Sequence, residues 1–296
     1  MHRGWLCAPL LAVVAVLAAC GNGGTPRDEA GPVDVVAAAY PFAWLAGQVG
    51  GPDVTVTDLV KAGAEPHDVE LSPRQVGKIG TAALVVFLKG FQPAVDDAVA
   101  QTGATTLDLG TVVGQQPLEG GSGAIDSKDP HVWLDPVRMQ TIATALGERL
   151  AKRDPAHAAG YRSRAAAVVA VLGQLDALFR SSLTGCTSKD IVTSHSAFGY
   201  LAGRYGLVQR GISGLSPDAE PSPGRIAEVA RFARQNHVKT IFFESLVDPK
   251  VAKTVAAEVG AQTAVLDPVE GVRVSDDYLS VQRRNAAALH EALGCS

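Results

Sequence analysis

Three of the seven histidines share a sequence context that suits a ligand of a metal ion. His67 stands in GAEPHDVELSP, His131 in DPHVWLDP and His195 in TSHSAFGYL, and each lies at a loop or strand end beside small or turn-forming residues. A buried imidazole needs a partner for its ring nitrogens. Taken singly, His67 and His131 could be surface loop residues and His195 a core histidine with a polar partner. Their wide spacing excludes a local zinc finger, so any shared site must be assembled by the fold.

Carboxylates close two of the apolar stretches that read as strands. Asp267 ends TAVLD, Glu244 ends VKTIFFE, and His195 ends DIVTSH. Ligands of open α/β sheets bind outside the carboxyl ends of the strands. Three neutral imidazoles and one carboxylate form a tetrahedral donor set that suits Zn²⁺. Asp267 can equally be a helix cap before Pro268, and Glu244 can be a simple ion-pair partner.

The elements that must position these residues are apolar strands alternating with helices. Continuous apolar runs separated by helical stretches predict parallel sheets covered on both faces. Proline after an N-cap residue marks helix starts at Ser72-Pro73 and Asp135-Pro136. The predicted strands are residues 33–41, 54–60, 83–90, 104–110, 190–195, 206–212, 238–244 and 263–267.

One predicted helix is much longer than the others. Apolar residues recur from Tyr161 to Leu183 at steps of four and three, which is one face of a helix. Such a helix between two α/β halves predicts two lobes, residues 33–155 and 185–296, joined by a rigid connector, residues 156–184. The alternative is a surface helix of a single lobe.

The first 32 residues resemble an export signal followed by a tether. Arg3 precedes an apolar run that is too short for a confident membrane span and ends in small residues. Leu17-Ala18-Ala19-Cys20 resembles a bacterial lipobox, which would lipidate Cys20 after removal of residues 1–20. Residues 21–32 then form a flexible polar tether. The alternative is an ordinary signal peptide cut nearby.

Composition and the remaining cysteines indicate which partners and which covalent bonds to expect. A net charge of −4, 5% aromatic residues and no basic run argue against nucleic acid as a partner. In an exported chain, Cys186 and Cys295 are expected to form a disulfide. Two free thiols or a metal site are the alternatives.

Five motifs together resemble a known family. GAEPHDVELSPRQ, DPHVWLDP, TSHSAFGYLAGRYGL, FFESLVDPKVAKTVAAEVGA and VLDPVEG resemble, in order and spacing, the cluster A-I metal-binding receptors of ABC importers (ZnuA-like and TroA-like). The resemblance runs from about Val33 to the C-terminus. It implies two α/β lobes joined by a rigid helix, with one metal ion between them. The ligand roles would fall on His67, His131, His195 and Asp267.

Two further carboxylates have roles in this interpretation. Glu244 would orient one of the metal ligands without itself binding the metal. Glu65 is the alternative oxygen donor to Asp267. Manganese receptors of the family carry a carboxylate at the position of His195, so three nitrogens and one oxygen favour zinc. The loop at 114–129 lacks the histidines of many zinc receptors, a departure from that pattern.

We therefore expect an extracytoplasmic receptor that captures Zn²⁺ and delivers it to the permease of an ABC importer. The receptor would be a monomer, not an enzyme, anchored by lipid to the outer face of the cytoplasmic membrane. A manganese or iron receptor of the same family is the nearest alternative. A surface adhesin and an exported zinc hydrolase with Glu244 as general base are the alternatives of other classes.

Overall fold

The first lobe is built on a four-stranded parallel sheet with strand order β2-β1-β3-β4. In this computed structural model, residues 1–2, 31–116, 128–217, 219–271 and 276–296 are described. Cys20, almost all of the expected signal and tether, and most of the 114–129 loop lie outside these ranges. The strands are β1 (Val33–Ala37), β2 (Val54–Asp58), β3 (Leu84–Phe87) and β4 (Thr106–Asp108). The helices are α1 (Tyr40–Gly50), α2 (Pro73–Thr81), α3 (Pro93–Thr102) and α4 (Leu109–Val113).

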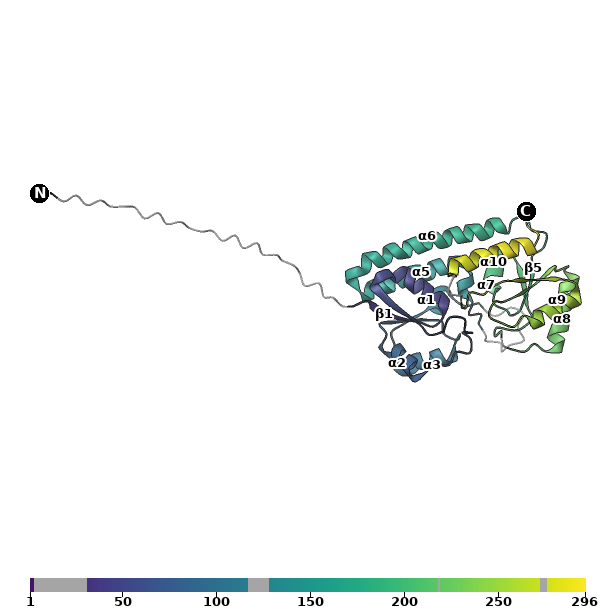
Figure 1. Ribbon diagram of the computed structural model, residues 1–296, viewed down its shortest axis with the longest axis horizontal. Coiled ribbons are helices and arrows are strands. Elements are labelled where there is room, and N and C mark those ends of the chain that lie inside the picture. The colour runs from purple at the N-terminus through teal and green to yellow at the C-terminus, as the bar shows by residue number, and fades with distance from the viewer. Residues whose placement is uncertain (3–30, 117–127, 218, 272–275) are drawn as a thin grey trace. The chain divides into compact units, whose positions relative to one another are not determined.

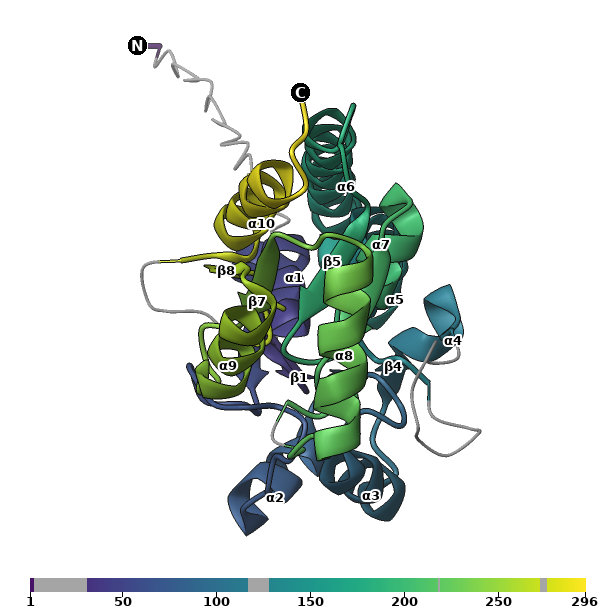
Figure 2. The same ribbon diagram turned by 90° about the vertical axis from the view of Figure 1, so that its right-hand side faces the viewer.

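The second lobe repeats this architecture with strand order β6-β5-β7-β8, again all parallel. Figure 2 looks toward this lobe and shows α8 and α9 in front of its strands. The strands are β5 (Asp190–Thr193), β6 (Val208–Gly211), β7 (Thr240–Phe243) and β8 (Gln262–Val265). The helices are α7 (Gly199–Tyr205), α8 (Pro223–Gln235), α9 (Lys250–Val259) and α10 (Tyr278–Ala292). The predicted pair of parallel α/β lobes is confirmed.

Two antiparallel helices, α5 (Pro136–Arg153) and α6 (Ala158–Ser182), follow the first lobe. A short turn, η3 (Pro155–His157), joins them. Along α6 the buried residues are Tyr161, Ala165, Val168, Leu172, Leu175 and Phe179, the predicted stripe. By length and hydropathy alone, Pro155–Ser182 could cross a membrane, but this stripe packs on α5 and α10 (Figure 1). The long helix between the lobes is therefore confirmed.

The lobes also contact each other directly, because α10 returns from the second lobe to the first (Figure 1). Tyr278 of α10 stacks on Trp44 of α1, with 4.6 Å between ring centroids. Arg204 of α7 donates two hydrogen bonds, both 2.8 Å, to the carboxylate of Asp135 at the start of α5. One apolar core includes buried residues of both lobes. A large shared apolar interface opposes wide domain opening.

A disulfide joins the segments that follow the two long helices of the interface. Cys186 lies just beyond α6 and Cys295 just beyond α10, and their sulfurs are bonded. The two bonded cysteines are 109 residues apart in the sequence. The C-terminus is thereby fixed beside the end of the connecting helix.

Candidate metal centre

Four buried side chains converge between the lobes: His67, His131, His195 and Glu270. Each offers one ligand atom, and these atoms all lie within 4.8 Å of one another. His67 and His131 belong to the first lobe, while His195 follows β5 and Glu270 follows β8 of the second. The carboxyl ends of parallel strands face this point, as expected for a ligand site of α/β sheets.

His131 enters the site from the start of a buried 3-10 turn, η2 (Val132–Leu134). Asp129 fixes its orientation, because one carboxylate oxygen accepts from the His131 backbone N–H at 2.9 Å and faces Nδ1 at 2.7 Å. The Nε2 atom then points to Glu270 Oε1, 3.0 Å away. Asp135 after the turn accepts the N–H groups of the first residues of α5, so it is the predicted helix cap. A histidine held at one nitrogen by a carboxylate presents the other to a metal.

His195 is oriented in the same way by Glu244, which lies one residue beyond β7. The Nδ1 atom of His195 is 2.6 Å from Glu244 Oε1. Ser194 also donates its hydroxyl to this carboxylate. The other ring nitrogen of His195, Nε2, lies 3.3 Å from Nε2 of His131. Glu244 thus contacts the ring nitrogen that faces away from the cluster.

His67 comes from the long segment between β2 and α2. Its Nε2 lies 3.1 Å from Glu270 Oε1, and its ring packs edge-on against Phe91, with 4.8 Å between centroids. Glu65 Oε1 accepts the His67 backbone N–H at 2.8 Å. The same oxygen lies 4.0 Å from His67 Nε2, so Glu65 borders the cluster without belonging to it.

Asp267 is the sequence-predicted ligand that the structure does not bring to the three histidines. Its carboxylate accepts the N–H of Val269 at 2.8 Å and the hydroxyl of Ser245. Asn285 holds its backbone N–H and C=O at 2.9 and 2.7 Å. These bonds shape the turn that carries Glu270. Glu270, three residues further, is therefore the carboxylate beside the histidines.

The turn before Glu270 has an unusual backbone. Val269 has a φ of 60°, in the left-handed region that β-branched residues rarely adopt, and its side chain is fully buried. Such conformations persist only when the surroundings hold them, and they cluster at functional sites. Asp267 supplies part of that support by accepting the Val269 N–H, and Asn285 and Trp133 bond to the two residues before Val269.

Opposing effects set the pKa values of the three histidines. Burial lowers the pKa of His67. Burial acts the same way on His131, but two neighbouring carboxylates outweigh it and raise its pKa. In His195 the negative charge of Glu244, with that of Glu270, overcomes burial and raises the pKa to about 10. The neighbouring carboxylates thus favour the protonated forms of His131 and His195, whereas burial favours the neutral form of His67.

The pKa values of Glu270 and of the neighbouring Glu65 shift in opposite directions. Burial would raise the pKa of Glu270, but hydrogen bonds from the three histidines hold it well below its usual value. Burial, followed by the charge of Glu270, raises the pKa of Glu65 to about 8. In the deprotonated form that metal binding requires, the three histidines offer three imidazole nitrogens, and Glu270 adds one anionic oxygen. This donor set is typical of zinc sites.

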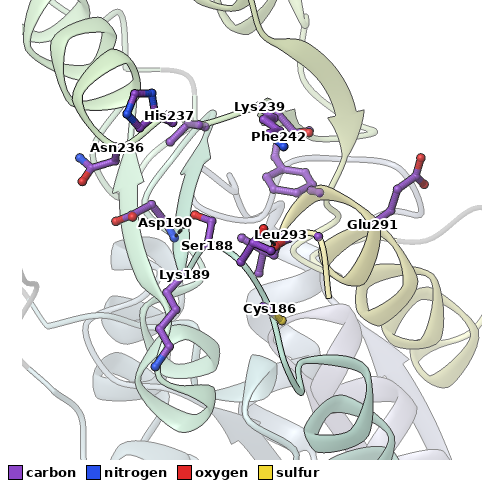
Figure 3. A pocket seen from close by; sticks show the side chains of 15 residues that line it. Cys186, Ser188, Lys189, Asp190, Asn236, His237, Lys239, Phe242, Glu291 and Leu293 are labelled. Atoms are coloured by element: carbon purple, nitrogen blue, oxygen red, sulfur yellow. Dashed lines mark hydrogen bonds between the residues drawn. The ribbon is translucent and has the colours of Figure 1, made fainter. Parts of the chain in front are cut away.

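A separate hollow lies at the other end of the second sheet, where Asp190 begins β5 and Thr240 begins β7. Figure 3 shows Lys189, His237 and Glu291 around it, close to the disulfide at Cys186. His195 and Glu244 follow the carboxyl ends of the same two strands. This hollow is thus distinct from the histidine cluster.

Comparison with known proteins identifies the family. Residues 35–292 match the family model for the zinc-uptake complex component A, periplasmic (ZnuA). The chain belongs to the ZnuA family. The resemblance inferred from the five sequence motifs is confirmed.

Individual members of the ZnuA family are similar to this chain over most of its length. The high-affinity zinc uptake system protein ZnuA of Bacillus subtilis is 32% identical over 99% of each chain. The zinc-binding lipoprotein AdcA of Streptococcus pneumoniae is 33% identical over 93% of this chain, which spans 58% of that longer protein. The laminin-binding protein Lmb of Streptococcus agalactiae, described as bifunctional with adhesin and metal transporting activity, is 32% identical. Its structure matches with a TM-score of 0.80 over 88% of this chain and 99% of Lmb.

Sequence reasoning missed Glu270 although the VLDPVEG motif contains it. Asp267 directly ends the apolar stretch, and Glu270 stands beyond Pro268 and Val269. Strand-end position therefore favoured Asp267, whereas Glu270 is the member of the motif that lies beside the histidines. The usable signal was a second acidic residue within the same short loop.

Proposed function

We propose that this chain is an extracytoplasmic receptor that binds one Zn²⁺ between its lobes and delivers it to an ABC importer. The observation that carries the proposal is the buried set of His67, His131, His195 and Glu270, with ligand atoms within 4.8 Å of one another, in a member of the ZnuA family. Three nitrogens and one oxygen suit Zn²⁺ better than the harder Mn²⁺, which favours oxygen ligands.

In this proposal each lobe contributes two ligands. Asp129 and Glu244 fix the rings of His131 and His195 before the ion arrives, which lowers the ordering cost of binding. Release to the permease requires only a small displacement of one ligand pair against the other, because every metal bond across the lobes lengthens together. The shared core and the paired α6 and α10 favour such a small movement.

Export and anchoring belong to the same proposal. The signal-like residues 1–20 and the lipobox resemblance at Cys20 would place the receptor at the outer face of the membrane, tethered by residues 21–32. Support comes from AdcA, which is named a lipoprotein, and from the periplasmic description of the family. A lipid anchor raises the local concentration of a monomeric receptor near its permease.

A zinc hydrolase is less consistent with this geometry. Catalytic zinc keeps an open coordination position and a nearby general base. Here Glu270 takes the fourth position beside the histidines. Glu244 faces Nδ1 of His195, on the far side of the ring from the cluster.

Adhesion is a second candidate function, favoured by the structural match to Lmb. It does not compete with metal binding, because the description of Lmb combines adhesin and metal transporting activity. Binding of the purified chain to immobilised laminin tests it. A signal no higher than that of an unrelated protein of equal charge would exclude adhesion to laminin.

The proposed function is tested by metal content and competition. The soluble chain from Asn22 to Ser296 contains the whole compact unit Pro32–Ser296. After stripping with a chelator, it is loaded with equimolar zinc and manganese, and bound metal is counted per chain. We expect one zinc per chain, lost in His131→Ala or His195→Ala and retained in His157→Ala, a control whose side chain is half exposed. Manganese binding in preference would give a manganese receptor, and no bound metal would overturn the proposal.

A further inference from the structure

Glu65 is a second carboxylate at the cluster with an unused oxygen. Its Oε1 accepts the backbone N–H of His67, whereas its Oε2 is buried and has no hydrogen-bond partner among the described residues. A buried, unpartnered carboxylate oxygen costs free energy. A divalent cation beside His67 would supply the missing partner.

Glu65 is also more exposed to solvent than any of the four residues of the cluster. Its side chain is 20% exposed, compared with 8% for His67 and 2% for Glu270, while His131 and His195 are fully buried. An additional ligand on this side would meet the ion where water otherwise could.

Packing between the lobes holds the segment that carries Glu65. A Cβ atom built on Gly271, the residue after Glu270, would lie 3.4 Å from Gly63 N and 3.5 Å from Ala64 O. The backbone just before Glu65 therefore passes close to Gly271, which follows Glu270. This close approach brings the segments that carry the two carboxylates together across the lobes.

We propose that Glu65 determines metal selectivity by supplying a fifth ligand, an oxygen, on the solvent side of the His67–His131–His195–Glu270 cluster. The proposal rests on the function proposed above. Zinc is satisfied by four ligands, whereas manganese prefers more ligands and more oxygen. Glu65 thus widens the range of divalent ions that the site accepts beyond zinc.

The test compares Glu65→Gln with Glu70→Gln, an exposed carboxylate on the same segment. Zinc and manganese affinities are measured by competition with a chromophoric chelator on the chain from Asn22 to Ser296. Both variants replace a carboxyl group on the same segment by a neutral amide, so a change of the affinity ratio that is confined to Glu65→Gln isolates the ligand effect. We expect Glu65→Gln to raise the preference for zinc over manganese at least about tenfold, and Glu70→Gln to leave it unchanged.

Cobalt supplies an independent readout of coordination number. Four-coordinate Co²⁺ absorbs visible light more strongly than five-coordinate Co²⁺, so the Co²⁺ band should intensify in Glu65→Gln relative to wild type. An unchanged zinc-to-manganese ratio together with an unchanged Co²⁺ band would overturn the role of Glu65. In that case wild type would still bind one zinc. A wild-type chain that binds no metal would instead overturn the proposed function itself.

Discussion

Trp133 of the first lobe donates its indole N–H to the carbonyl oxygen of Pro268 in the second lobe, at 2.7 Å. His131 lies two residues before Trp133, and Glu270 lies two residues after Pro268. The hydroxyl of Tyr278 donates to the Trp133 carbonyl oxygen at 2.6 Å. One hydrogen-bonded chain therefore sets the distance between two candidate ligands from different lobes.

We predict that Trp133→Phe weakens zinc binding while the chain still folds. The variant leaves the buried Pro268 carbonyl without its donor, a loss of about 1–3 kcal/mol, and relaxes the turn that carries Glu270. Zinc affinity should fall about tenfold or more, a change that corresponds to about 1.4 kcal/mol. The measurement is a competition titration with a chelator, alongside urea unfolding.

Trp44→Phe is the matched control for this variant. Trp44 packs on Tyr278 but has no contact with the 267–270 turn among the described hydrogen bonds and ring pairs. It should lose stability without a comparable loss of zinc affinity. Equal loss of affinity in the two variants would show that the indole N–H of Trp133 has no special role.

Asp267 and Glu270 should respond differently to removal of their charge. In Asp267→Asn the amide oxygen can still accept the Val269 N–H, so the turn keeps its shape. We expect zinc affinity to fall by about tenfold, the lower end of the range for residues that support a ligand without binding the metal. Glu270→Gln removes the anionic donor itself, and the affinity should fall by at least about a hundredfold. An equal effect of both substitutions would restore Asp267 as a ligand.

The sequence predicted the fold well because local signals agreed with one another. Ser72 forms the reciprocal capping box with Gln75, and Asp135 caps α5, as the Ser-Pro and Asp-Pro pairs indicated. The continuous apolar run of β3 is buried throughout. These features depend on neighbours in sequence, so pattern alone was sufficient.

The choice between Asp267 and Glu270 depends on residues far away in sequence. The left-handed Val269 is preceded by backbone that Trp133 and Asn285 hold, because Trp133 donates to the carbonyl of Pro268 and Asn285 accepts the N–H of Asp267. No periodicity in VLDPVEG encodes those contacts. The packing of α10 against the first lobe, through Tyr278 and Trp44, could not be predicted from the sequence pattern either. Local motifs can name the segments of a site, but tertiary contacts decide which side chain faces inward.

Asp58, the last residue of β2, should make the stability of the chain depend on pH. Burial raises its pKa to about 6 in the folded protein from 3.8. The folded state therefore prefers the protonated form, and a charged Asp58 destabilises it relative to the unfolded state. This destabilisation is absent below about pH 3.8, where Asp58 is protonated in both states, and complete above about pH 6, where it is charged in both. Asp58→Asn removes this destabilisation and keeps an acceptor for the Val60 N–H.

We therefore expect Asp58→Asn to raise the free energy of unfolding at pH 7.5 by about 1–3 kcal/mol, with a gain that shrinks as the pH falls from 6 to 4. Urea unfolding at several pH values measures this. Asp34→Asn, at an exposed position of β1 in the same sheet, should stay within about 0.5 kcal/mol of wild type. A gain that does not depend on pH would refute the role of charge burial.

The disulfide between Cys186 and Cys295 should stabilise the fold without affecting the metal site. For a loop of 109 residues in sequence separation, the chain-entropy model gives about 4–5 kcal/mol, and loss of such bonds typically costs 2–5 kcal/mol. Cys186 precedes β5 at its amino end, whereas His195 follows its carboxyl end. The double variant Cys186→Ser/Cys295→Ser should therefore unfold at lower urea concentration yet bind zinc as tightly as wild type. Reductant supplies the control, because it should lower the Tm of wild type and leave that of the double variant unchanged. If reductant leaves the Tm of wild type unchanged, the disulfide contributes nothing to stability.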